Sequence, residues 1–242
     1  MYNSKIYSIY LDTLMIKHIT LDAWNTLLVP NATFAKLRTE FLSDHLRLPL
    51  EKVKGTYTEV KNYIDNYTEE KSDFAPENRT CYVILLNNLG FRASSEIESC
   101  NIGHIIEVIQ KLFIANPPSI PDELIYTLQQ PYEVTWSVIS NTNFVTGTII
   151  NEVIKSHIGY QNTANIRNFY SDIEKHSKPS PYMFEQTILA LNDGVRTVER
   201  GQVVHIGDNM NCDVKGAVLA GFNASLVISP TQTAEKIQSI VY

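Results

Sequence analysis

Short apolar runs alternate with polar segments along this chain, and four of these runs predict buried strands. They cover residues 16–21, 134–139, 203–206 and 224–228, and each is rich in aliphatic or β-branched residues. Continuous apolar runs of this length are typical of strands that are buried on both faces, as in a parallel sheet. The first three runs lead directly into polar residues.

Two segments near these runs show helical spacing and helical end signals. Residues 182–192 follow Ser180-Pro181, a plausible cap and first turn, and Asp193-Gly194 should stop the helix. Residues 211–220 end at Gly221, a natural left-handed stop. The alternation of strands and helices predicts an α/β fold with a doubly wound parallel sheet.

A long helical stretch interrupts this alternation just after the first strand. Helical patterns cover residues 34–46, 53–66, 80–89 and 102–114, and the prolines from Pro117 to Pro121 mark the return to the sheet. A connection of this length far exceeds ordinary loops, which suggests a lid or cap. We therefore expect an α/β core of residues 1–29 and 118–242 and a helical cap of residues 30–117.

Composition and charge narrow the classes of function. The 242 residues are 44% hydrophobic and 19% charged, as in an ordinary globular protein. The net charge is −6 and lysine and arginine do not cluster, so nucleic acid is not an expected partner. No apolar run approaches the roughly 18 residues of a membrane span, so no membrane partner is expected either.

The N-terminal stretch and the cysteines fit an intracellular protein. Residues 6–16 are apolar but contain Asp12 and lack a small-residue cleavage site, which favours part of the fold over a signal peptide. Cys81, Cys100 and Cys212 are far apart and form no CxxC pair, so zinc and disulfide frameworks are disfavoured. Reduced thiols in a cytoplasmic protein are expected instead.

Polar residues follow the predicted strands at positions where they can converge. Asp22 follows the first strand, Ser140-Asn141 the second and Gly207-Asp208-Asn209 the third, while Lys178 precedes a predicted helix. Open α/β sheets bind their ligands at the carboxyl ends of the strands. We therefore expect these residues to form one site.

The residue types at this predicted site suit a phosphate group and a magnesium ion. An ionised Asp22 is a usable nucleophile towards phosphorus or carbon, and Lys178 could offset its repulsion of a phosphate dianion. Asp22 and Asp208 could hold magnesium through oxygen ligands. The Ser140 hydroxyl and nearby backbone N–H groups could bind phosphate oxygens. Gly207 would let the backbone approach the metal.

Four segments resemble, in order and spacing, the motifs of the haloacid dehalogenase-like hydrolase superfamily. They are ITLDAWNTLL, VISN, HSKPSPYMF and HIGDNMNCDVKGA. The predicted helical cap also lies where that family carries its cap, between the first and second motifs. The resemblance covers essentially the whole chain and implies a magnesium cofactor and a small-molecule substrate.

The resemblance also implies a role for each matching residue. Asp22 would be the nucleophile, Lys178 would stabilise charge and Ser140 would bind phosphate. Asp208 and the backbone carbonyl of Trp24 would join Asp22 as magnesium ligands. Neighbouring side chains complete the candidate site: Trp24, Asn25 and Asn141 towards the substrate, and Asn209 and Asp213 in support of the metal and Lys178.

Trp24 departs from the family's phosphatase pattern. Most phosphatases of the superfamily carry a second aspartate two residues after the nucleophile, which protonates the leaving oxygen and then activates water. Indole can do neither, and such acid–base help is typically worth about 10²–10⁴-fold in rate. The dehalogenase branch also carries an aromatic residue there, but its fourth motif lacks the GDN pattern of residues 207–209.

These features favour a magnesium-dependent phosphatase that acts on a small phosphorylated metabolite through an aspartyl-phosphate on Asp22. A 2-haloacid dehalogenase is the first alternative, because halide needs no proton when it leaves. A catalytically silent relative that binds a ligand or a protein is the second.

Several of these residues also have a purely structural interpretation. Asp22 could cap a turn, Ser140-Asn141 could cap a helix, and Asn25 could simply suit its turn. Trp24 could line the pocket or fill space between sheet and cap. His205 is expected to be structural.

Overall fold

The computed structural model describes residues 15–71, 73–159, 167–193 and 197–241. At its centre is a five-stranded sheet, ordered β3-β2-β1-β4-β5, in which every pair of neighbours is parallel. The strands are β1 (His18–Leu21), β2 (Thr135–Ser140), β3 (Phe169–Tyr170), β4 (Val203–Gly207) and β5 (Asn223–Leu226). The α/β class and the parallel sheet agree with the prediction from the apolar runs.

Two details of the sheet differ from the prediction. The strand predicted over residues 224–228 ends at Leu226, because the Ile228 backbone N–H donates instead to the Gln232 side chain at 2.9 Å, at the start of α12 (Pro230–Val241). β3 was not predicted, since only two of its residues pair with β2. A strand that short carries no readable alternation.

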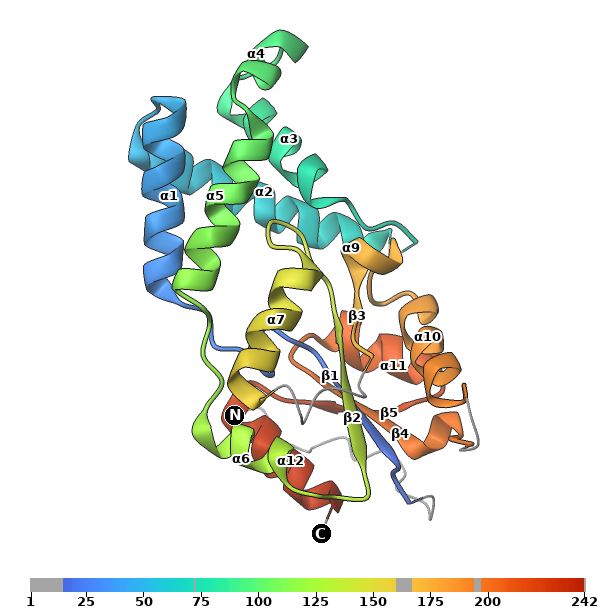
Figure 1. The fold of residues 1–242 in the computed structure, drawn as a ribbon. Coiled ribbons are helices and arrows are strands. Elements are labelled where there is room, and N and C mark those ends of the chain that lie inside the picture. The colour runs from blue at the N-terminus through green and yellow to red at the C-terminus, as the bar shows by residue number, and fades with distance from the viewer. Residues whose placement is uncertain (1–14, 72, 160–166, 194–196, 242) are drawn as a thin grey trace, which may run out of the picture.

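Helices cover both faces of the sheet. Successive strand residues point to opposite faces, and here Val138 and Ile139 of β2 belong to two separate apolar clusters. The helices α6 (Asp122–Gln129), α7 (Gly147–Ile158) and α12 contribute to the first cluster, and α10 (Pro181–Leu191) and α11 (Gly216–Leu219) to the second. Figure 1 shows α7 and α10 on opposite sides of the strands. The sheet is therefore doubly wound, as predicted.

The predicted helix end signals operate as expected, with one change. The Ser180 hydroxyl accepts from the Tyr182 N–H at 3.4 Å and caps α10. Gly221 has a φ of +82°, which glycine adopts without steric cost. The helix predicted over residues 211–220 is instead a π-helical turn, Met210–Lys215, followed by the short α11.

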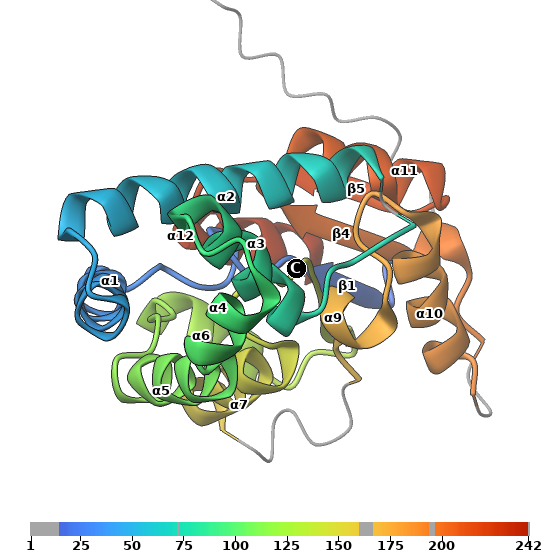
Figure 2. The same ribbon diagram turned by 90° about the horizontal axis from the view of Figure 1, so that it is seen from above.

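Five of the six described helices between β1 and β2 form a helical insert, residues 32–115. They are α1 (Ala32–Leu46), α2 (Leu50–Glu70), α3 (Asn78–Leu89), α4 (Ser94–Ser99) and α5 (Ile102–Ala115). Figure 1 shows the insert above the sheet, and Figure 2, seen from above, shows α2 as a long helix that begins beside α1. The two chain connections to the insert lie side by side, because Val29 and Ser119 exchange backbone hydrogen bonds of 2.8 and 3.1 Å.

All three cysteines are buried and carry free thiols. Burial raises the pKa of Cys81 and of Cys212 to about 12. Among the described residues, no helix is long and apolar enough to cross a bilayer. The apolar stretch of residues 6–16 lies almost entirely outside the described part of the chain, and so does Gly194 of the predicted helix stop.

His18, the first residue of β1, is buried, and its ring forms hydrogen bonds with the hydroxyls of Thr135 and Ser137 of β2 at 2.7 and 2.8 Å. Burial lowers the pKa of His18 from 6.5 to about 3. Between these values His18 binds fewer protons in the folded protein than in the unfolded chain, so its contribution lowers the free energy of unfolding as the pH falls through this window.

We predict that His18→Gln flattens this pH dependence. Below pH 6.5, His18 should remove about 1.4 kcal/mol of unfolding free energy per pH unit, whereas glutamine does not titrate. Urea denaturation between about pH 7.5 and about pH 5 measures the slope. His104→Gln, at an exposed position, is the matched control and should keep the wild-type slope. Equal slopes for wild type and His18→Gln would contradict the prediction.

Candidate active site

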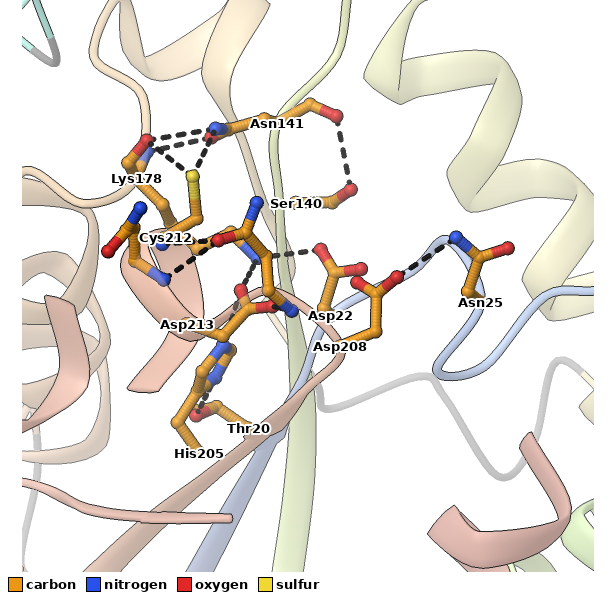
Figure 3. Close-up of polar contacts among 12 residues, drawn as sticks. Thr20, Asp22, Asn25, Ser140, Asn141, Lys178, His205, Asp208, Cys212 and Asp213 are labelled. Carbon is orange, nitrogen blue, oxygen red and sulfur yellow. Dashed lines mark hydrogen bonds and ion pairs between the residues drawn. The ribbon is translucent and has the colours of Figure 1, made fainter. Parts of the chain in front are cut away.

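Lys178 is at the centre of the polar residues gathered beyond the strand ends (Figure 3). Its Nζ donates to Oδ1 of Asp22 and to Oδ1 of Asp213, both at 2.6 Å, and its side chain is only 2% exposed. A buried ammonium is costly unless it is paired and hydrogen-bonded. Burial alone would lower the pKa of Lys178, but the two carboxylates raise it, so the lysine stays charged.

Asp213 uses both of its oxygens within the protein. Besides Lys178, Oδ1 contacts Nε2 of His205 at 3.2 Å, and Oδ2 accepts from the Asn209 backbone N–H at 2.8 Å. Burial opposes ionisation, but Lys178 and His205 hold the pKa of Asp213 below its usual range. Asp213 is therefore a fixed anion that positions the lysine.

His205 orients Asp213 from inside the sheet. Burial lowers the pKa of His205, which favours the neutral ring. Since a carboxylate only accepts, Nε2 donates to Asp213, and Nδ1 then accepts from the Thr20 hydroxyl at 2.8 Å. The expected structural role of His205 thus consists of holding one carboxylate in place.

Asn141 holds the backbone of Lys178. Its Oδ1 accepts from the Lys178 N–H at 2.7 Å, and its Nδ2 donates to the Lys178 carbonyl at 2.9 Å. The Cys212 thiol also lies 3.5 Å from that carbonyl. Asn141 lines the pocket described below, but its amide is already paired in this way, and its contact with a substrate stays a prediction.

Asp22 has one carboxylate oxygen without a described partner. Its backbone N–H donates to the Ile206 carbonyl at 2.9 Å, and this hydrogen bond joins the end of β1 to β4. Its Oδ1 accepts a hydrogen bond from Lys178. Burial raises the pKa of Asp22 to about 7; Lys178 opposes this shift and Asp213 adds to it. Burial is the larger cause, and the single Lys178 ammonium, shared between two buried carboxylates, does not offset it. A further cation beside Asp22 would favour its ionised form.

The carboxylates beyond the carboxyl ends of β1 and β4 fit a magnesium ion. Asp22, Asp208 and Asp213 offer oxygens within 4.8 Å of one another, but those of Asp213 are already used. Asp208 is half-buried, and only its Oδ2 has a described partner, Nδ2 of Asn25 at 2.9 Å. Asp22 and Asp208 therefore each retain an oxygen, and magnesium is commonly held by one or two carboxylates together with water.

Two asparagines shape the loops that carry these acids. Asn25 has a φ of +58°, a left-handed conformation that asparagine tolerates better than most residues. Asn209 caps the π-helical turn, because its Oδ1 accepts from the backbone N–H groups of Asn211 and Cys212 at 2.8 and 3.0 Å. Both residues thus have local structural roles beside the acids.

Ser140 is fully buried at the end of β2. Its hydroxyl is 3.3 Å from the Asn141 carbonyl, which is a long contact, and Ser140 is not among the described residues that line the pocket. The structure brings Ser140 beside the site, and its binding of phosphate stays a prediction.

A pocket of about 370 Å³ lies above Asp22, between the sheet and the insert, a size suited to a small molecule. A larger cavity of about 1390 Å³ lies at the amino ends of β1 and β2, away from these carboxylates. Part of the wall comes from insert residues that no motif indicated: Phe34, Arg38, Tyr57, Lys61, Asp65, Glu69 and Phe113.

Trp24 both lines this pocket and fills space beneath the insert. Its ring contacts Phe113 of α5 edge-on, with 6.2 Å between ring centres. Lining the pocket and filling space between sheet and insert are therefore compatible positions for Trp24. Its carbonyl oxygen accepts no described backbone hydrogen bond, which leaves the predicted backbone metal ligand available.

Residues 16–221 match the haloacid dehalogenase-like hydrolases. The chain belongs to this family. The match spans all four motif segments and confirms the resemblance seen in the sequence, and hydrolases of this family act on small molecules. A sequence search of curated proteins found no match.

Solved structures of the family share the fold. YfnB from Bacillus subtilis, bound to magnesium, has a TM-score of 0.67 at 15% identity, over 93% of this chain and 100% of that one. A HAD phosphatase from Thermococcus onnurineus has 0.58 at 17%, over 88% and 86%. A 2-haloacid dehalogenase from Pseudomonas syringae has 0.56 at 15%, over 93% and 99%. The likeness extends to phosphatases and dehalogenases alike and does not choose between them.

We predict that Gly207→Ala destabilises the protein by about 1–3 kcal/mol. A Cβ at Gly207 would lie 2.2 Å from Cγ and Oδ2 of Asp213. The sequence suggested that this glycine admits the backbone to a metal; in the structure it makes room for Asp213. Gly55→Ala in α2, with nothing within 4 Å, is the control and should stabilise by about 0.5–1 kcal/mol. Urea titration measures both, and an unchanged Gly207→Ala protein would refute the steric explanation.

Proposed function

We propose that this protein is a magnesium-dependent phosphatase that hydrolyses a small phosphorylated metabolite through an aspartyl-phosphate on Asp22. One observation carries the proposal: Asp22 contacts the buried Lys178 ammonium at 2.6 Å, keeps its other oxygen open and shares a pocket with Asp208. A nucleophile, a fixed cation and a second acid for a metal are what attack on a phosphate dianion requires.

In the proposed reaction the open oxygen of Asp22 attacks phosphorus, the bond to the leaving oxygen breaks, and that oxygen takes the electron pair. Lys178 offsets the negative charge on the phosphoryl oxygens, with the predicted help of Ser140. Asp213 cannot compete as a nucleophile, because both of its oxygens are hydrogen-bonded. Magnesium would be held by Asp208, by the Trp24 carbonyl and by the Asp22 oxygen that also contacts Lys178, and would neutralise phosphate charge. Water then cleaves the aspartyl-phosphate.

Trp24 limits the leaving groups in this mechanism, because it supplies no proton. We predict that aryl phosphates, whose leaving oxygens need little protonation, turn over much faster than alkyl phosphates. Trp24→Asp should raise the alkyl rate by about 10²-fold or more, and Asp22→Asn should abolish both. Phosphate release with magnesium measures the rates, with Trp24→Phe as the control that should not gain alkyl activity. Equal and robust wild-type rates on both esters would show that another group donates the proton.

The same residue favours a second function, hydrolysis of a carbon–halogen bond. A halide leaves without a proton, and Trp24 offers none. For the phosphatase we expect phosphate release that EDTA abolishes and no chloride release from 2-chloropropionate. Magnesium-independent chloride release that requires Asp22 would instead establish the dehalogenase.

We further propose that residues 30–117 act as the cap of this enzyme. The insert supplies much of the pocket wall, so its position would control water access and substrate choice. The free thiols support the cytoplasmic location expected from the sequence.

A further inference from the structure

The pocket above Asp22 contains three cationic side chains, and two of them are already paired. Lys178 is held by Asp22 and Asp213, and Lys61 is 2.5 Å from Asp65. Arg38, on α1 of the insert, forms no ion pair with any residue that the structure describes. Among the cationic side chains of this pocket, Arg38 is therefore the one whose charge can pair with an anionic group of a ligand.

The Arg38 guanidinium is fixed by aromatic rings and keeps an unused donor, Nε. Its central carbon lies 3.6 Å from the centre of the Tyr57 ring and 5.5 Å from that of Phe34. Stacking of this kind holds the guanidinium plane in place. The Nε atom is buried without a hydrogen-bond partner, which is unfavourable until an acceptor arrives.

Tyr57 cannot serve as the missing anion. Burial raises the pKa of Tyr57 to about 12, so the phenol is neutral at ordinary pH. Its ring is fixed in turn by Phe144, with 4.5 Å between ring centres. Arg38 is thus a rigidly mounted charge on the cap side of the pocket, and Asp22 lies in the wall that the core provides.

We infer that Arg38 binds a carboxylate on the substrate, remote from the phosphoryl group that meets Asp22. This inference rests on the proposed function and defines its substrate class as carboxylated phosphate esters. The planar guanidinium matches a carboxylate in a two-point contact. A second phosphate is disfavoured, because the pocket already contains five acids (Asp22, Asp65, Glu69, Asp208 and Asp213) and this one unpaired cation.

The test uses two matched esters, 4-carboxyphenyl phosphate and 4-carbamoylphenyl phosphate. Wild type should favour the carboxylate by about 10-fold or more in kcat/KM, mainly through KM. Arg38→Gln should remove this preference, and Arg38→Lys should retain part of it. Lys36→Gln, on the same helix with a 73% exposed side chain, should keep it in full. Comparison of each variant with wild type cancels the intrinsic difference between the esters.

A binding measurement separates this inference from the proposed function. Calorimetry with the corresponding non-hydrolysable phosphonates requires no turnover. A carboxylate preference that Arg38→Gln abolishes supports the inference even if no ester is hydrolysed, in which case only the phosphatase proposal fails. Equal binding of the two phosphonates by wild type, no binding of either, or a preference that survives in Arg38→Gln would overturn it.

Discussion

The site depends on the ion cluster in which the Lys178 ammonium lies between Asp22 and Asp213. An ammonium that is 2% exposed cannot remain charged without partners. Asp22 follows β1 directly, Asp213 lies in the π-helical turn after β4, and Lys178 lies in the chain between β3 and α10. The cluster can form only when the sheet has the order that places β1 beside β4. Removing one partner from such a buried pair typically costs about 3–5 kcal/mol, so fold and site are energetically coupled.

The residues around this cluster act through it. His205 holds Asp213, Gly207 makes room for it, and Asn141 holds the backbone of Lys178. None of them needs to touch a substrate to matter for the chemistry. The cluster has one positive and two negative groups, and burial together with this shortage of positive charge raises the pKa of Asp22. That shortage makes a divalent cation beside Asp22 favourable.

The core and its acids could be predicted from the sequence because their signals are local. A strand buried on both faces is a continuous apolar run, and the polar residue after it marks the strand end, as at Asp22 and Asp208. The two-residue strand β3 has no such signal. The part of the pocket wall that the insert supplies could not be predicted from the sequence either. Arg38 and Tyr57 lie on different helices, and only the folded structure brings them into contact. The pairing of Asn141 with the Lys178 backbone also spans loops that are distant in the sequence.

The burial of the three cysteines has a practical consequence. The thiolate is the reactive form of cysteine, and burial raises the pKa of Cys81, Cys100 and Cys212. The native protein should therefore react slowly with maleimides. A pair of cysteines introduced at exposed positions, one on α2 and one on α10, could then carry dyes or spin labels without removal of any native thiol. The separation between insert and core could be followed spectroscopically in an otherwise unaltered chain.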